Sequence, residues 1–162
     1  MTNRSIVLSL VAAVACALAL LPSAGAQADG RTQRTQTLRF FDKPVSITLT
    51  RPSGVVIDHA PYPQARPGDV LDVNSVAYMG THLRHAKQWT ASSHLQCTFR
   101  AAGPPSCVSH IAIGGSQLVF SGNPGKLVNG TGIYQGASGR TISSKELADD
   151  ASDVVLRIQL AA

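Results

Sequence analysis

Glycine and proline divide most of this chain into short segments. Beyond Thr50 the interruptions fall at residues 52–54, 61–68, 103–105, 114–115, 122–125, 130–132 and 136–139. Both residue types are unfavourable inside helices and strands, so each segment between two interruptions has room for only a short element. The segments are rich in Val, Ile, Thr and aromatic residues, and none carries apolar residues at helical spacing. The sequence therefore predicts an all-β fold.

About eight or nine short strands in one domain are typical of an antiparallel barrel or sandwich. Residues 144–152 form the best helical candidate, but the segment is short, and we expect a turn or a single helical turn there. The segments predicted as strands are Thr37–Phe41, Val45–Thr50, Val70–Met79, Leu83–Thr90, His94–Ala101, Ser106–Ile113, Gln117–Ser121, Thr141–Leu147 and Val154–Leu160.

The N-terminus has the three-part layout of a secretory signal peptide. Arg4 supplies a positive charge, residues 6–21 are apolar, and small residues follow. The apolar run is too short, and its far flank too rich in small residues, for an anchor that spans a bilayer of about 30 Å. We expect cleavage after Ala26 or Ala28 and a secreted protein without a membrane span. The alternative, a lipoprotein acylated at Cys16, is disfavoured because the next residues remain apolar.

The rest of the chain is long enough for one domain. After the signal peptide at residues 1–28, the polar residues 29–36 are predicted to form a flexible leader, and residues 37–162 a single domain. The formal net charge is +5, and the Lys and Arg residues are scattered, with no basic run and no interleaved aromatic residues. A nucleic-acid partner is therefore not indicated.

Two cysteines remain after the signal peptide, Cys97 and Cys107, and thiols oxidise in extracellular compartments. We expect a disulfide between them across the turn at residues 101–105. The close spacing typical of metal-binding cysteine pairs is missing, so no metal site is predicted.

The same cysteines predict the register of the surrounding hairpin. If they lie directly opposite each other, so do His94 and His110, on the other face of the sheet. A bulge at Pro104-Pro105 would shift this register. A histidine pair can share a proton or hold a metal, but two partly exposed imidazoles are the favoured interpretation, because no third ligand is suitably spaced. The cysteine face also carries Leu95, Phe99, Ser109 and Ile111.

The most specific motif is the segment 129–139, in which one aromatic residue stands between closely spaced glycines. Glycine is favoured where a side chain would collide or where φ is positive, so the segment predicts close turns around a fixed ring. A phosphate-binding loop is not indicated, because no strand and helix are predicted around it and Lys126 precedes it. The motif positions are Gly130, Gly132, Tyr134, Gly136 and Gly139.

This segment resembles the signature of the allene oxide cyclase and dirigent superfamily, G-[GT]-[ST]-G-x-[FY]-x-G-x-x-G. Weaker similarities cover roughly residues 67–160 in the same order. The resemblance implies an eight-stranded antiparallel β-barrel around an apolar cavity, often in homodimers or homotrimers, that acts without a cofactor. The weaker similarities lie at Pro67–Val70, at the turn Met79–Thr81 after the strand that contains Tyr78, at Leu95–Phe99 and at Ile111–Gly115.

Some members of this superfamily hold a reactive apolar intermediate so that it closes in one stereochemical sense. The resemblance thus implies a barrel that binds a small apolar molecule and steers its cyclisation or stereoselective coupling, as an isomerase. The alternative is a non-catalytic ligand-binding or structural module, which the low aromatic content of 5% favours. Plant dirigent proteins carry an arginine where this chain has Ser138, and their paired aspartates have no clear counterpart, so no catalytic residue is carried over.

Four residues are candidates for ligand binding: Tyr134, Tyr78, Trp89 and Arg140. The Tyr134 hydroxyl can bond a ligand, although an aromatic ring at this position more often fills the barrel core. Trp89 suits the cavity mouth and the outer surface or an oligomer contact equally well. Arg140 can orient an anionic group, but an exposed position at a strand end is the favoured interpretation.

Overall fold

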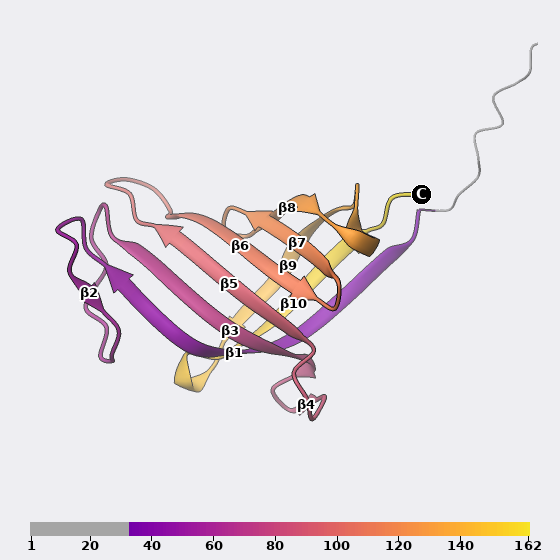
Figure 1. Cartoon of the computed structure of the whole chain (residues 1–162), viewed down its shortest axis with the longest axis horizontal. Coiled ribbons are helices and arrows are strands. Elements are labelled where there is room, and N and C mark those ends of the chain that lie inside the picture. Colours follow the sequence, from indigo (N-terminus) through magenta and orange to yellow (C-terminus); the bar gives the residue numbers. More distant parts are fainter. Residues whose placement is uncertain (1–32) are drawn as a thin grey trace, which may run out of the picture. The chain divides into compact units, whose positions relative to one another are not determined.

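The computed structural model describes residues 33–162, so the predicted signal peptide, its cleavage sites and Cys16 lie outside the described residues. Within this range, ten strands form one antiparallel sheet, and the two helical segments are single 3₁₀ turns (Figure 1). No helix in this part of the chain is long and apolar enough to cross a membrane. The elements are β1 (Thr35–Thr50), β2 (Val56–Ile57), β3 (Val70–Thr81), β4 (Arg84–His85), β5 (Ala91–Thr98), β6 (Ser106–Ile113), β7 (Ser116–Ser121), β8 (Lys126–Gly130), η1 (Gly132–Tyr134), β9 (Ser138–Glu146), η2 (Ala148–Asp150) and β10 (Ser152–Gln159).

The sheet closes into a barrel because β1 is long enough to pair along both edges. Its first half pairs with β10 and its second half with β3, and residues Phe40–Asp42 pair with both. The order β1-β10-β9-β8-β7-β6-β5-β3 therefore forms the eight-stranded antiparallel barrel that the sequence predicts. The narrowest junction joins β8 and β9, through a single bridge between Lys126 and Arg140.

The first strand differs from its prediction. The strands expected at residues 37–41 and 45–50 form one continuous strand, which begins at Thr35, before the predicted domain boundary. The gap between the two predicted strands contains Pro44, and proline lacks the backbone N–H that a regular ladder needs. The chain instead accommodates this proline at a register shift between Pro44 and Ser46, where the pairing with β3 is interrupted without ending the strand.

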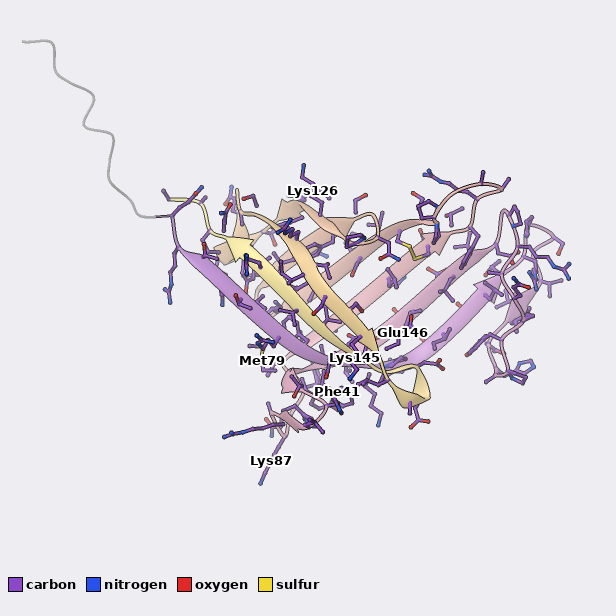
Figure 2. All side chains as sticks on the ribbon, turned by 180° about the vertical axis from the view of Figure 1, so that it is seen from behind. Phe41, Met79, Lys87, Lys126, Lys145 and Glu146 are labelled. Carbon is purple, nitrogen blue, oxygen red and sulfur yellow. A yellow bond between two sulfur atoms is a disulfide. The ribbon has the colours of Figure 1, made fainter. Side chains whose placement is uncertain are left out.

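The predicted strand Leu83–Thr90 is wrong. Only Arg84 and His85 pair, with the end of β3, and the following residues have no regular structure. Gly80 has φ +119°, and a Cβ at this position would collide with the backbone of Arg84, so the chain turns sharply there. Because β5 already pairs with the free edge of β3, this segment has no second strand to join. It forms a short excursion on which Lys87 points away from the barrel (Figure 2).

The glycine-rich segment makes the close turns that its sequence predicts. A Cβ at Gly130 would collide with the carbonyl oxygen of Tyr134, and Gly132 has φ +61°. The segment runs from the end of β8 through η1, which buries the Tyr134 ring to 2% exposure. This ring packs in the hydrophobic core with Leu38, Phe40, Ala77, Ala91, Ile111, Leu118, Phe120, Leu127, Leu156 and Ile158.

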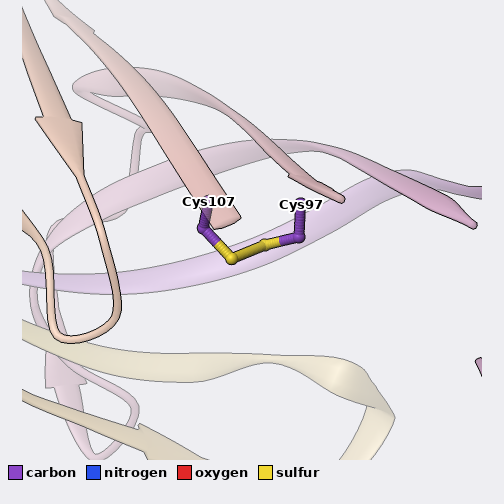
Figure 3. The surroundings of a disulfide bond; sticks show 2 residues. All are labelled: Cys97 and Cys107. Carbon is purple, nitrogen blue, oxygen red and sulfur yellow. A yellow bond between two sulfur atoms is a disulfide. The ribbon is translucent and has the colours of Figure 1, made fainter. Parts of the chain in front are cut away.

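The predicted disulfide and its register are confirmed. Cys97 on β5 and Cys107 on β6 are bonded, with a Cα–Cα distance of 4.1 Å (Figure 3). They lie directly opposite each other, and His94 faces His110 as expected, so the turn at Pro104-Pro105 introduces no shift. Residues 144–152, where a turn or a single helical turn is expected, contain the short turn η2, in which Asp149 and Asp150 have positive φ.

We predict that Gly130→Ala lowers the free energy of unfolding by about 1–3 kcal/mol, because the new methyl group has to displace the backbone at Tyr134. Urea unfolding at equilibrium measures this change. Gly115→Ala is the matched control: a Cβ at Gly115 meets nothing within 4 Å. Equal stabilities of the two variants would contradict the close approach at Gly130.

We also predict that replacing both Cys97 and Cys107 by serine lowers the free energy of unfolding by about 2–3 kcal/mol, the chain-entropy value for so short a loop. Urea unfolding of the double variant, compared with the wild type with and without reductant, measures the effect. Reductant should bring the wild type close to the variant and leave the variant unchanged. If reductant also lowers the free energy of unfolding of the variant, the loss of stability in the wild type does not come from the disulfide.

Candidate functional site

The barrel contains a cavity of about 480 Å³, within the range of small-molecule sites. Its floor is formed by side chains of the hydrophobic core, among them Phe40, Ile111, Phe120 and Leu156. Its walls carry an unusual number of small polar side chains. These are Ser75, Ser93, Ser109, Asn123, Thr141, Ser143, Ser144 and Ser152.

The cavity exists because inward positions on adjacent strands hold small residues. On β3 the inward residues include Ser75 and Ala77, and directly opposite them on β5 lie Ser93 and Ala91. Leucine or isoleucine at these positions would fill the interior, since a barrel of eight strands is only just wide enough for its own side chains. The small residues therefore leave room for one small ligand.

Asp42 places a carboxylate inside this cavity. It follows Leu38 and Phe40 on the inward face of β1, where alternate residues point to the same side. Its Oδ1 accepts a hydrogen bond of 2.9 Å from the Ser93 hydroxyl. Burial raises the pKa of Asp42 above 3.8, and hydrogen bonds from Ser93 and Ser75 only partly offset this effect. A carboxyl group of this kind can exchange a proton with a bound molecule.

Glu146, an exposed residue at the end of β9, contributes a second carboxylate to the cavity lining (Figure 2). Ser152 on β10 pairs with Asp42 on one side and with Glu146 on the other, so the two acidic residues flank the same position of β10. Lys, Arg and His are absent from the described residues that line the cavity. The charged groups of the cavity are therefore acidic.

The four candidate residues from the sequence lie outside the lining of this cavity. Tyr134 is in the core, and burial raises the pKa of its hydroxyl above 10.0. Tyr78 packs against Phe41 and His85 with tilted rings, at ring-centroid distances of 6.1 and 5.2 Å. Trp89 is 59% exposed, between β4 and β5. Arg140 is exposed on β9.

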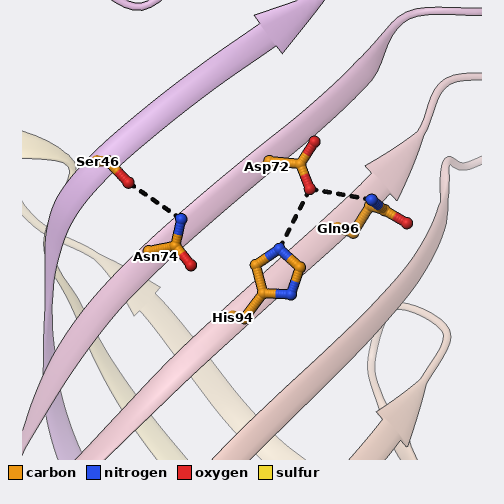
Figure 4. Close-up of polar contacts among 5 residues, drawn as sticks. All are labelled: Ser46, Asp72, Asn74, His94 and Gln96. Atoms are coloured by element: carbon orange, nitrogen blue, oxygen red, sulfur yellow. Dashed lines mark hydrogen bonds and ion pairs between the residues drawn. The ribbon is translucent and has the colours of Figure 1, made fainter.

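His94 of the hairpin belongs to a polar network on β3 and β5 (Figure 4), and His110 on β6 lies directly opposite it. The Asp72 carboxylate is 3.2 Å from His94 Nε2 and accepts a hydrogen bond from Gln96. His94 and His110 stack with ring centroids 6.4 Å apart. These residues alternate with the cavity-lining Leu95 and Cys97, so they face the outside of the barrel. In residues 33–162 no group of three or more potential metal ligands comes together.

Sequence reasoning missed Asp42 as a site residue, although a signal for it exists. Leu38, Phe40 and Asp42 alternate with the charged or aromatic residues between them, which is the period of a strand with one buried face. The predicted end of the first strand at Phe41 concealed this continuation. By contrast, the predicted cysteine face lines the cavity with Leu95, Cys97, Cys107, Ser109 and Ile111, whereas Phe99 lies beyond the end of β5 and outside the lining.

We predict that Asp42→Asn gains stability relative to the wild type as the pH rises. The pKa of Asp42 is higher in the folded protein than the ordinary 3.8, so the wild type loses stability as the pH rises through the folded-state pKa. The amide does not ionise and avoids this loss. Urea unfolding of both proteins from below pH 3.8 to neutral pH measures the difference. A difference that is constant over this range would contradict the burial of an ionising carboxyl group.

Comparison with known proteins supports the fold alone. No protein-family model matches the chain, and no curated protein sequence gives a significant match. A solved structure titled pyocyanin demethylase superposes with a TM-score of 0.54 at 13% identity, over 78% of this chain and 100% of that one. The pterocarpan synthase dirigent protein GePTS1 gives a TM-score of 0.49 at 15% identity, over 78% and 87%. The chain therefore shares the fold of a protein of known structure, and this fold is the closed eight-stranded antiparallel barrel that the sequence predicts.

Proposed function

We propose that this barrel binds a small, largely apolar molecule in its cavity and steers a cofactor-free isomerisation or cyclisation of it. The observation that carries the proposal is the position of Asp42, a carboxyl group in a cavity that is lined mostly by apolar and hydroxyl side chains, hydrogen-bonded to Ser93. The apolar floor would hold the body of the ligand, and the polar wall would fix its orientation.

In this proposal Asp42 acts as both base and acid. The carboxylate takes a proton from one atom of the bound molecule and returns it at another, so the product has the same composition as the substrate. Hydrogen bonds from Ser93 and Ser75 stabilise the ionised form between these two steps. The rigid walls contribute by restricting the ligand to one conformation, which selects one stereochemical outcome.

The proposed place of action is outside the cytoplasm. The disulfide Cys97–Cys107 is compatible with an oxidising compartment, and residues 1–28 carry the features of a signal peptide. The solved structure of similar fold is named for an activity on pyocyanin, a small molecule, which fits a barrel that acts on small molecules.

We predict that Ser144→Trp abolishes ligand retention. Ser144 is an exposed residue of β9 that lines the cavity, so a large side chain there blocks the cavity. Ser92→Trp is the control, because Ser92 is exposed on β5 and alternates with the inward Ser93. Native mass spectrometry of each protein, produced in its own host, measures the retained molecule and the number of subunits together. Retention by Ser144→Trp would place the ligand elsewhere.

The proposed proton transfer by Asp42 has a separate test. We incubate the wild type and Asp42→Asn with the host's extracted small molecules in D₂O and analyse the mixture by liquid chromatography and mass spectrometry. The wild type should convert one compound to an isomer of altered retention time that has gained deuterium at carbon, and the variant should not. If the wild type binds a molecule without changing it, the protein is a binding module and not an enzyme.

A further inference from the structure

We propose that the cavity selects organic cations, such as an amine with an apolar body, over neutral and anionic molecules of the same shape. This inference rests on the proposed small-molecule site and adds the class of ligand. Its basis is the distribution of charge around the cavity, where acidic side chains are present and basic ones are absent from the described lining.

Asp42 has no cation beside it. The partners that lower its pKa are the neutral hydroxyl groups of Ser93 and Ser75, and no ion pair of Asp42 occurs among the described residues. A partly buried carboxylate without a counter-charge, such as that of Asp42, is unfavourable, because hydroxyl hydrogen bonds replace only part of its hydration. A cationic group bound at this position would offset that cost, whereas a neutral group would offset less of it.

The nearest basic residues along the chain face away from the cavity. Lys43 follows Asp42 on β1 and is exposed on the opposite face of the strand. Lys145 precedes Glu146 on β9 and pairs with Asp153 on β10, whose pKa it helps to lower. Neither residue is part of the cavity lining. The carboxylate of Asp42 and that of the exposed lining residue Glu146 are therefore both available to a ligand.

The charge of the cavity is opposite to that of the whole chain, which is +5. The overall charge would favour the approach of anions, so it does not explain a preference for cations. An anionic ligand, such as a fatty acid, would place its carboxylate in a cavity that already holds Asp42 and Glu146 and offers no basic group. The selection we propose is thus made by the local charges of the cavity.

The remaining walls define the body of the ligand. Phe40, Phe120, Ile111 and Leu156 offer apolar contacts at the floor, on which a ring or a branched chain can pack. The serine hydroxyls can accept further hydrogen bonds from an ammonium group. A primary alkylamine that carries an aromatic ring satisfies both parts of this cavity and is a suitable probe.

The test uses three probes with one ring system: naphthylmethylamine as the cation, naphthylmethanol as the neutral analogue and naphthoate as the anion. Their dissociation constants for the full-length mature protein are measured by calorimetry at neutral pH. A charge-assisted hydrogen bond contributes more than a neutral one, so the amine should bind about tenfold or more tightly than the alcohol. Naphthoate should bind most weakly.

Two variants assign the preference to the cavity. Asp42→Asn should reduce the ratio of amine to alcohol affinity by about tenfold while changing the affinity for the alcohol little. Asp72→Asn removes the same charge from the network on the outer face of β3 and should leave both affinities unchanged. Circular dichroism of each variant checks that the fold is retained.

The outcomes separate this inference from the proposed function. Similar affinities for the amine and the alcohol, or a preference that survives in Asp42→Asn, would overturn the selection of cations and leave the small-molecule site standing. Binding of naphthoate as tight as that of the amine would also overturn the selection of cations. If none of the three probes binds the wild type at millimolar concentration, while Ser144→Trp retains the natural ligand, both proposals fail.

Discussion

The double pairing of β1 is the constraint on which the rest of this structure depends. A single strand meets β10 along one half and β3 along the other, and the two pairings overlap at Phe40–Asp42. Without that overlap the sheet would remain open, with two unpaired edges and no enclosed interior. The residues that close the barrel, Phe40–Asp42, therefore also include the carboxyl group of the cavity.

One part of the barrel interior is filled by side chains, and the other part contains the cavity. Large apolar side chains, together with the Tyr134 ring, fill the part of the barrel near the first half of β1. Serine and alanine on β3 and β5 leave the adjoining part unfilled. The apolar part supplies stability by burial, so the other part can carry polar groups that contribute little to folding. The ionisation of Asp42, for example, lowers the free energy of unfolding, because the side chain is partly buried.

The fold was largely predictable from local patterns, and the site was not. Segments rich in Val, Ile and Thr between glycine and proline gave most strands, and the cysteine pair gave one hairpin register without error. The segment Leu83–Thr90 has strand-forming residues but no free edge to pair with, which only the tertiary structure decides. Pro44 concealed the continuity of β1, and with it the inward position of Asp42. Serine residues carry no signal for a cavity until the register places them on one wall.

The disulfide contributes more than a cross-link, because both of its cysteines line the cavity. The wall of the cavity thus includes a covalent bond that forms only where thiols are oxidised. Before oxidation, the same positions hold two separate thiol groups, and β5 and β6 are joined by their backbone pairing alone. The covalent part of the cavity wall is therefore complete only in a compartment that oxidises thiols.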